Sequence, residues 1–198
     1  MQELSLNILD IAENSVKAGA ALVTVGVCYR PAQDRLTVTI ADDGCGMDAE
    51  TLQKVTDPFY TTRTTRRVGL GVPFFRMAAE LTGGGLTIQS EVGKGTAVTA
   101  VFGLTSIDRM PLGDMNGTIA ALVQCNPGTD FVYTYRVDGR EMRLDTREFR
   151  EVLGDLPLDD PQVLSFLRDY LAENTEELLH PNGRAGRERE EQKEEPPQ

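Results

Sequence analysis

The chain has 198 residues, of which 40% are hydrophobic, and a formal net charge of −11 at pH 7. This size allows one well-packed core and one or two domains. The excess of acidic residues argues against a broad nucleic-acid or anionic-membrane surface, because phosphate contact needs clustered Lys and Arg. No apolar run approaches the ~20 residues of a membrane helix, and the N-terminus lacks the layout of a secretory signal. We therefore expect a cytoplasmic protein without nucleic-acid or membrane partners.

The three cysteines, Cys28, Cys45 and Cys125, lie far apart in the sequence. They lack the paired spacing that is typical of zinc sites and disulfide frameworks. We expect reduced thiols and no metal bound through them.

Residues 4–18 carry apolar side chains at helical spacing, which predicts a helix. Asn7, Asp10, Asn14 and Lys17 recur at steps of three and four, so they fall on one polar face of that helix. Such a face has a simple explanation, because most polar helix faces are merely solvated.

The rest of the first half alternates between strand and helix patterns. In chain order we expect strands at 22–27 and 35–40, a short helix at 48–55, a polar loop at 57–71, a helix at 72–81, and strands at 86–90 and 97–104. A loop of this length usually has a function. The order of elements predicts an α+β sandwich in which helices cover a mixed or antiparallel sheet.

The second half is less informative. The patterns predict helices at 114–125, 145–153 and 161–179 and a hairpin of strands 131–136 and 141–144. We interpret residues 105–180 as a small C-terminal α+β extension of the domain at 1–104. Residues 181–198 contain almost nothing apolar to bury, which predicts a disordered charged tail.

Four segments combine glycines and polar residues at the ends of predicted elements. They are Asn14 on the first helix, Asp42 with Gly44 and Gly46 after the second strand, Gly69-Leu70-Gly71 at the end of the loop, and Gly93-Lys94-Gly95-Thr96 before the last strand. Each alone is explained by a turn or by a helix end. Their occurrence together, in this order, points to one shared site.

These segments have the chemistry of a purine-nucleotide pocket. A carboxylate at Asp42 can accept a hydrogen bond from the exocyclic amine of adenine, whereas it would repel the carbonyl of guanine, so we expect ATP rather than GTP. Gly44 and Gly46 allow the backbone to approach a flat base without a Cβ clash. Gly69 and Gly71 would let the N–H groups at a helix N-terminus face the phosphates.

Two residues of the first helix fit the metal and phosphate end of the ligand. Asn14 offers a neutral side-chain oxygen to Mg²⁺, which usually keeps several waters and shares the phosphates. Lys17, one turn further on the same face, would add positive charge near those phosphates.

The same segments resemble the GHKL superfamily of ATP-binding domains over residues 1 to about 104, and most closely the catalytic domains of bacterial histidine kinases. The resemblance rests on five motifs: Asp10–Lys17 resembles the N box, Ala41–Met47 the G1 box, Asp57–Thr62 the F box, Val68–Gly71 the G2 box and Ser90–Thr96 the G3 segment. It implies a Bergerat fold, Mg-ATP as cofactor and a mobile lid at about residues 59–71. It also implies that Met47, Phe59, Leu70 and Thr96 join the residues above in binding the nucleotide.

Two positions depart from the family pattern. Arg67 stands where many kinases have the first glycine of the G2 run, which would alter the motion of the lid. Asp10 stands where the ATPase branches place a Glu that activates water and where kinases often have Asn or Glu. Asp10 remains the candidate general base, although its side chain is one methylene shorter.

The acceptor of a phosphoryl group is not evident in this sequence. We expect no dimerisation helix pair with a phosphoacceptor histidine before the N box, and we expect His180, the only histidine of the sequence, to be solvent-exposed. Three functions stay open. The chain could be a kinase acting on His, Ser or Thr of an unknown protein partner, or a non-catalytic module whose affinity for a partner depends on ATP. It could also be a slow ATPase with Asp10 as the general base. The oligomeric state is left open.

Overall fold

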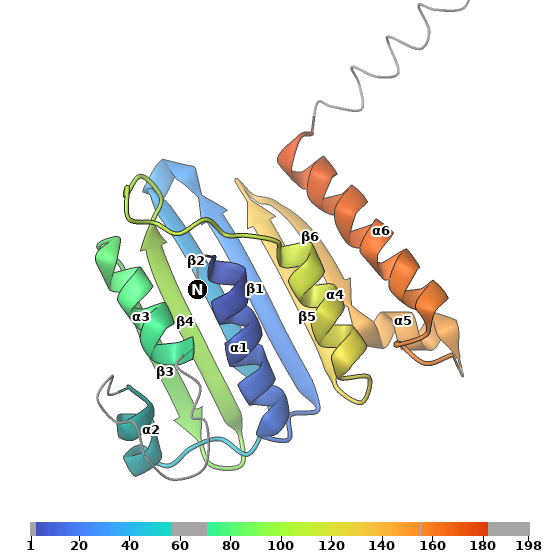
Figure 1. The fold of residues 1–198 in the computed structure, drawn as a ribbon, viewed down its shortest axis with the longest axis horizontal. Coiled ribbons are helices and arrows are strands. Elements are labelled where there is room, and N and C mark those ends of the chain that lie inside the picture. Colours follow the sequence, from blue (N-terminus) through green and yellow to red (C-terminus); the bar gives the residue numbers. More distant parts are fainter. Residues whose placement is uncertain (1–2, 57–70, 155, 182–198) are drawn as a thin grey trace, which may run out of the picture.

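The computed structural model describes residues 3–56, 71–154 and 156–181, and these residues form an α+β fold (Figure 1). The helices are α1 (Leu4–Lys17), α2 (Ala49–Thr56), α3 (Gly71–Leu81), α4 (Met115–Cys125), α5 (Thr146–Leu153) and α6 (Pro161–Leu179), with a short 3-10 helix at Pro31–Gln33. The strands are β1 (Leu22–Arg30), β2 (Arg35–Asp42), β3 (Gly85–Glu91), β4 (Gly95–Gly103), β5 (Asp130–Val137) and β6 (Arg140–Asp145). Most of the predicted loop and the tail from residue 182 lie outside the described residues.

The strands of the described chain form one sheet in the order β3-β4-β2-β1-β5-β6. Neighbours are antiparallel except β1 and β5, which are parallel, so the sheet is mixed, as predicted. In the β2–β4 pair Ile40 lies opposite Val98, and Asp42 lies opposite Thr96. The register therefore places the last residue of β2 beside the second residue of β4.

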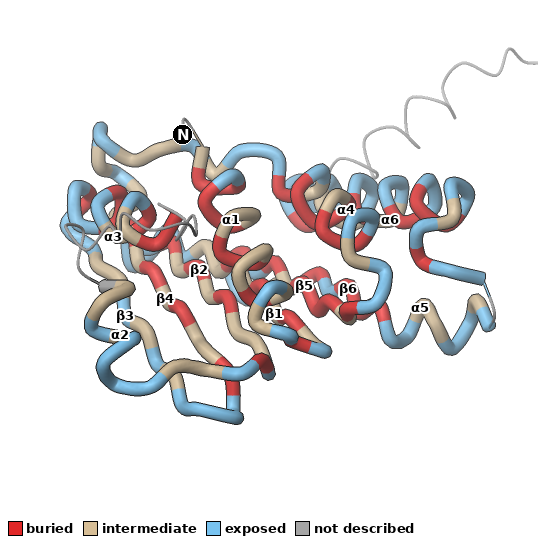
Figure 2. Tube along the Cα trace, turned by 60° about the horizontal axis from the view of Figure 1, so that its bottom comes forward, coloured by how far each residue is buried: buried red, intermediate tan, exposed pale blue. Residues whose placement is uncertain are grey.

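Helices α1, α3, α4 and α6 cover one face of this sheet (Figures 1 and 2). In β1 and β2 the residues that face these helices are buried at every second position; in β1 they are Val23, Val25 and Val27. Burial of one such side chain contributes about 1.5–3 kcal/mol, so the alternating pattern fixes which side of each strand packs against the helices.

The C-terminal extension continues the sheet of the first domain. β5 pairs with β1 along its length, from Leu22 opposite Asp130 to Tyr29 opposite Val137. The segment between β4 and α4 also binds the start of α1, because Leu4 N–H donates to the carbonyl of Pro111 at 3.0 Å. Buried side chains of both parts form one core cluster. The division of the chain into two parts at residue 104 stays a prediction. The structure shows that the two parts share one hydrophobic core.

Three aspartates explain how the helices of the extension begin. Asp114, Asp145 and Asp160 each accept a hydrogen bond from a backbone N–H in the first turn of the next helix. Such N-caps satisfy N–H groups that have no partner within the helix. The helices predicted to start at residues 114 and 145 therefore start one residue later, because their first predicted residue is the cap.

The predicted polar face of α1 is buried at its N-terminal end. Asn7 is 0% exposed, and neither atom of its amide has a hydrogen-bond partner among the described residues. Solvation, the alternative explanation for this face, does not apply to Asn7, because α1 lies between α3 and α4 on the sheet (Figure 1). A buried unpaired polar group costs about 1–3 kcal/mol.

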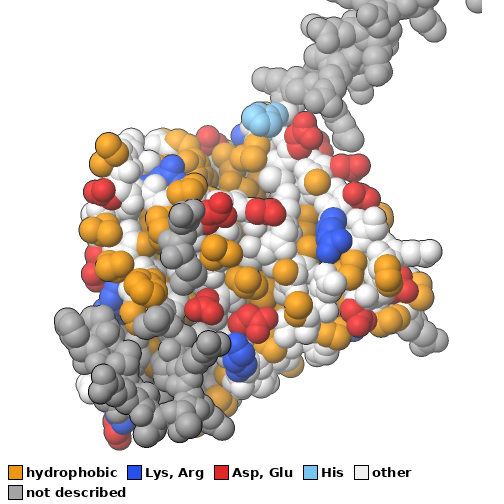
Figure 3. Space-filling model, in the orientation of Figure 1, with side chains coloured by type: hydrophobic (Ala, Val, Ile, Leu, Met, Phe, Trp, Pro, Cys, Tyr) orange, Lys and Arg blue, Asp and Glu red, His pale blue; other side chains and the backbone are white. Residues whose placement is uncertain are grey.

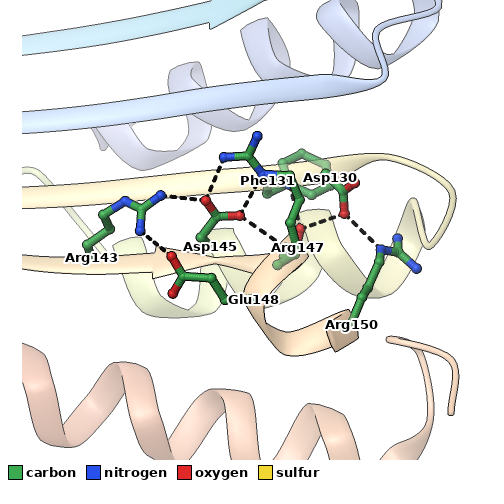
Figure 4. A network of polar contacts seen from close by, with 8 residues as sticks. Asp130, Phe131, Arg143, Asp145, Arg147, Glu148 and Arg150 are labelled. Atoms are coloured by element: carbon green, nitrogen blue, oxygen red, sulfur yellow. Dashed lines mark hydrogen bonds and ion pairs between the residues drawn. The ribbon is translucent and has the colours of Figure 1, made fainter. Parts of the chain in front are cut away.

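A network of charges joins the β5–β6 hairpin to α5 (Figure 4). Asp145, only 2% exposed, accepts hydrogen bonds from Nε and Nη2 of Arg147 at 2.9 and 2.7 Å. Arg143 pairs with the same carboxylate and with Glu148. The hydrogen bonds from Arg147 lower the pKa of Asp145, and burial opposes them.

This network predicts a pH-dependent part of stability. The pKa of Asp145 is lower in the folded than in the unfolded chain, where it is about 3.9, so its contribution is present above that value and is lost as the pH falls below it. The difference in urea midpoint between pH 7 and pH 3 should be smaller in Asp145→Asn than in the wild type. Equal differences in the two proteins would contradict the prediction.

Two tyrosines allow a test of how a hydroxyl with and without a hydrogen-bond partner affects stability. The hydroxyl of Tyr133 is buried without a partner among the described residues, whereas that of Tyr170 donates to the carbonyl of Arg143 at 2.9 Å. Burial also raises the pKa of Tyr133. Tyr133→Phe should raise the free energy of unfolding by about 1 kcal/mol, and Tyr170→Phe should lower it by about 1 kcal/mol. Urea denaturation measures both, and the same sign for both variants would contradict this reading.

Candidate functional site

The carboxylate of Asp42 is held in one orientation at the end of β2. Its Oδ1 accepts hydrogen bonds from the backbone N–H of Gly44 at 3.0 Å and of Thr96 at 3.2 Å. Its Oδ2 accepts from the hydroxyl of Ser15 in α1 at 2.6 Å. Three segments far apart in the sequence thus meet at one side chain, which is half-buried.

A cavity of about 230 Å³ opens beside this carboxylate. One water needs only about 10–15 Å³ by a comparable measure, so the cavity has the size of an organic ligand group. Its described lining residues are Ile11, Asn14, Ser15, Ala18, Asp42, Cys45, Gly46, Met47, Val55, Val72, Ile88, Thr96 and Val98. The walls are mainly apolar with a few polar groups, as expected for a flat heterocycle that is recognised at one edge. The structure brings together five predicted site residues: Asn14, Asp42, Gly46, Met47 and Thr96.

The glycines after β2 are needed for packing within the protein. Gly46 has a φ of +63°, and a Cβ on it would lie 2.0 Å from the carbonyl oxygen of Glu91. A Cβ on Gly44 would lie 3.0 Å from the carbonyl oxygen of Ala18. The β2–α2 loop therefore packs tightly on both α1 and the β3–β4 hairpin, a reason for these glycines that the sequence did not reveal.

The second acid of the motif has a structural role. Asp43 accepts a hydrogen bond from the backbone N–H of Leu22 at 2.9 Å, and Cys45 N–H donates to Ala18 O at 3.0 Å. Both bonds fasten the loop that carries the site. Cys28, Cys45 and Cys125 are free thiols, as predicted, and the one at Cys45 is exposed.

The polar residues of α1 divide into two groups. Asn14 lines the cavity, and its side chain makes no hydrogen bond to another described residue. Lys17 is 68% exposed and pairs with Glu13 at 3.6 Å, and it is not among the described lining residues. Glu13 also accepts from Asn126 Nδ2 at 3.1 Å, so its carboxylate is held on the side of α4.

Asp10, the candidate general base, lies against the start of α3. A Cβ on Gly71, the first residue of α3, would lie 2.7 Å from Asp10 Oδ2. The carboxylate therefore adjoins the helix N-terminus that was predicted to face the phosphates. Phe59, Gly69 and Leu70, and with them the predicted lid, lie outside the described residues.

Two hydroxyl groups were missed by sequence reasoning. Ser15 bonds Asp42, and Ser90 contacts Met47 and Thr96 at the end of β3. Ser15 lies within the segment that resembles the N box and Ser90 begins the one that resembles the G3 segment, but neither was named as a site residue. A hydroxyl on an otherwise apolar helix face was the available signal for Ser15.

The described residues contain no cluster of three or more His, Cys, Asp or Glu that would hold a metal. A magnesium ion bound mainly by phosphates and water needs no such cluster. In the same described part of the chain, no helix is both long and apolar enough to span a bilayer.

Comparison with known proteins agrees with this geometry. Residues 1–106 match the family model of histidine kinase-, DNA gyrase B- and HSP90-like ATPases. A putative sensor protein of Shewanella frigidimarina is 30% identical over 54% of this chain and 16% of its own length. Sporulation kinase C of Bacillus subtilis is 29% identical over 52% of this chain and 24% of its own length. The matched region is thus a minor part of these relatives.

A solved structure, the N-terminal domain of a DNA repair protein, shares the fold with a TM-score of 0.50 at 12% identity, over 73% of this chain and 53% of the other. The sheet, the cavity beside Asp42 and the matched motifs agree with one assignment. The chain belongs to the family of histidine kinase-, DNA gyrase B- and HSP90-like ATPases, and it carries the ATP-binding GHKL domain of that family.

Proposed function

We propose that this domain binds Mg-ATP with its base in the cavity beside Asp42 and transfers the γ-phosphoryl group to a side chain of a partner protein. The observation that carries the binding is the carboxylate of Asp42, which is fixed by three hydrogen bonds and lines an apolar cavity. A fixed acceptor at one edge of such a cavity favours a ring with an amino group, as in adenine.

Asn14 would hold the metal. Its amide lines the same cavity without a hydrogen bond to another described residue, so its oxygen is available as a ligand. Bound Mg²⁺ would neutralise charge on the phosphates, which is its usual role in phosphoryl transfer.

The N-terminus of α3 would bind the phosphates. Gly71 and Val72 begin this 11-residue helix, and Val72 lines the cavity. The backbone N–H groups and the positive end of the helix dipole favour an anion at this point. Lys17, exposed on α1, would add positive charge only if its pairing with Glu13 is exchanged for the phosphates.

The acceptor is assigned to a partner because the one histidine of this chain is poorly placed. His180 is exposed at the end of α6, on the side of the molecule opposite the C-terminal end of α1 (Figures 1 and 3). The relative named as a sporulation kinase supports transfer rather than hydrolysis.

Slow ATP hydrolysis is the second candidate, and the position of Asp10 favours it. Its carboxylate adjoins the start of α3, where it could accept a proton from a water molecule near the phosphates. Asp10→Asn tests this candidate, because it should abolish release of inorganic phosphate but spare nucleotide binding.

The test uses the full chain, γ-labelled ATP, Mg²⁺ and an extract that supplies the partner. Label on a protein of the extract supports transfer, and label released as phosphate by the purified chain supports hydrolysis. Saturable binding without either would reduce the function to an ATP-dependent interaction module. Asn14→Ala, which removes the metal ligand, should abolish each of the first two signals.

A further inference from the structure

The hydroxyl of Ser90 lies behind the wall of the cavity and contacts two elements of that wall. Its Oγ is 2.8 Å from the backbone nitrogen of Met47, 3.1 Å from the carbonyl oxygen of Gly95 and 2.9 Å from Oγ1 of Thr96. Of the described residues, Met47 and Thr96 line the cavity, whereas Ser90 does not. Any effect of Ser90 on a ligand in this cavity therefore acts through these neighbours.

The three contacts fix the direction of each hydrogen bond. A hydroxyl has one proton to donate and two lone pairs that accept. The N–H of Met47 can only donate, and the carbonyl of Gly95 can only accept. The hydroxyl of Ser90 therefore donates its proton to the carbonyl of Gly95. If all three contacts are hydrogen bonds, the hydroxyl of Thr96 must donate its own proton to Ser90.

This assignment determines what the cavity offers to a ligand. With its proton directed to Ser90, the hydroxyl of Thr96 can present only lone pairs. The carboxylate of Asp42 also acts as an acceptor, since its hydrogen bonds come from the hydroxyl of Ser15 and from the backbone N–H groups of Gly44 and Thr96. The part of the polar edge that Asp42 and Thr96 form is thus made of acceptors.

We propose that Ser90 is a positioning residue for base selection. By holding the proton of Thr96 away from the cavity, it makes the edge formed by Asp42 and Thr96 favour a purine with an amino group at position 6 over one with an oxygen there. The proposal rests on the proposed ATP binding. It adds that Ser90 determines whether the hydroxyl of Thr96 donates or accepts a hydrogen bond toward the base.

The test compares ATP with inosine triphosphate, in which an oxygen replaces the 6-amino group. In Ser90→Ala the hydroxyl of Thr96 is free to turn and donate to that oxygen. The preference for ATP, measured as the ratio of the two Kd values by calorimetry, should fall by about tenfold, the worth of one hydrogen bond. Ser90→Thr keeps a hydroxyl and should restore the ratio of the wild type.

Thr82→Ala is the matched control. The hydroxyl of Thr82 donates to Ala79 O at 2.8 Å and accepts from Gly103 N at 3.1 Å, so it bridges backbone groups as Ser90 does, but at the other end of the β3–β4 pair. Its loss should lower the midpoint of urea unfolding and leave the Kd ratio unchanged. An equal change of the ratio in Thr82→Ala would assign the effect to general loosening and overturn the proposal.

Thr96→Val gives a second, independent variant if Ser90→Ala does not fold. It removes the hydroxyl at similar size, so ATP affinity should fall by about tenfold while inosine triphosphate affinity stays the same. A ratio that stays at the wild-type value in either folded variant overturns the proposal, even though the wild type binds ATP. A wild-type chain that binds neither nucleotide overturns the proposed function, and this inference with it.

Discussion

Asp42→Ala is expected to weaken Mg-ATP binding by about 100-fold, measured as Kd by isothermal titration calorimetry. The side chain is the charged acceptor of the cavity, and a hydrogen bond to a charged group is worth about 1.5–3 kcal/mol. The substitution also leaves the N–H groups of Gly44 and Thr96 without their partner, so the loop that lines the cavity loses its anchor.

Asp43→Asn is the control for that experiment. The neighbouring acid bonds the backbone of Leu22, and it is not among the described lining residues. It keeps an acceptor oxygen after the change, so Kd should stay within about twofold of the wild type. The assignment of Asp42 to the base fails if Asp42→Ala binds as the wild type does, or if both variants lose affinity equally.

Gly95→Ala is expected to lower the free energy of unfolding, measured with urea, by about 2–4 kcal/mol. Gly95 has a φ of +104°, and a Cβ on it would lie 1.9 Å from the carbonyl oxygen of Asp42. The cost combines the strain of a left-handed conformation with a clash between two backbones that cannot move independently. Since the clash displaces Asp42, ATP affinity should fall as well.

Gly93→Ala isolates the conformational part of this cost. Gly93 lies in the same turn with a φ of +76°, and a Cβ on it would meet no atom within 4 Å. Its replacement should cost only about 1–2 kcal/mol and leave the Kd for ATP unchanged. Similar losses in the two variants would show that the close approach of Gly95 to β2 does not matter.

Sequence patterns predicted the elements because local physics decides them. The spacing of Leu4, Ile8 and Ile11 on α1 is helical, and the alternation in β2 has a period of two. The motif after β2 placed an acid and two glycines at a strand end, where Asp42 lines the cavity. These features depend on residues close in the sequence, so they could be read without the fold.

Contacts between distant segments could not be read in this way. The parallel pairing of β5 with β1, the burial of Asn7 between helices and the bond from Ser15 to Asp42 all depend on which elements become neighbours. Periodicity gives the face of an element and leaves its neighbour open. This is why the attachment of the extension and the burial at the start of α1 were not predicted.

The sequence alone determined the α+β fold, the order of the elements and the acid and glycines at the end of β2, since strand and helix periods and the glycine motifs are local. Only the tertiary structure decided how the site at Asp42 is built. Asp42 is bonded to Ser15, 27 positions away, and to Thr96, 54 positions away, while Ser90 lies behind the wall. A hydrogen bond depends on a few tenths of an ångström between atoms, and the packing of α1 and the register of the sheet set those distances.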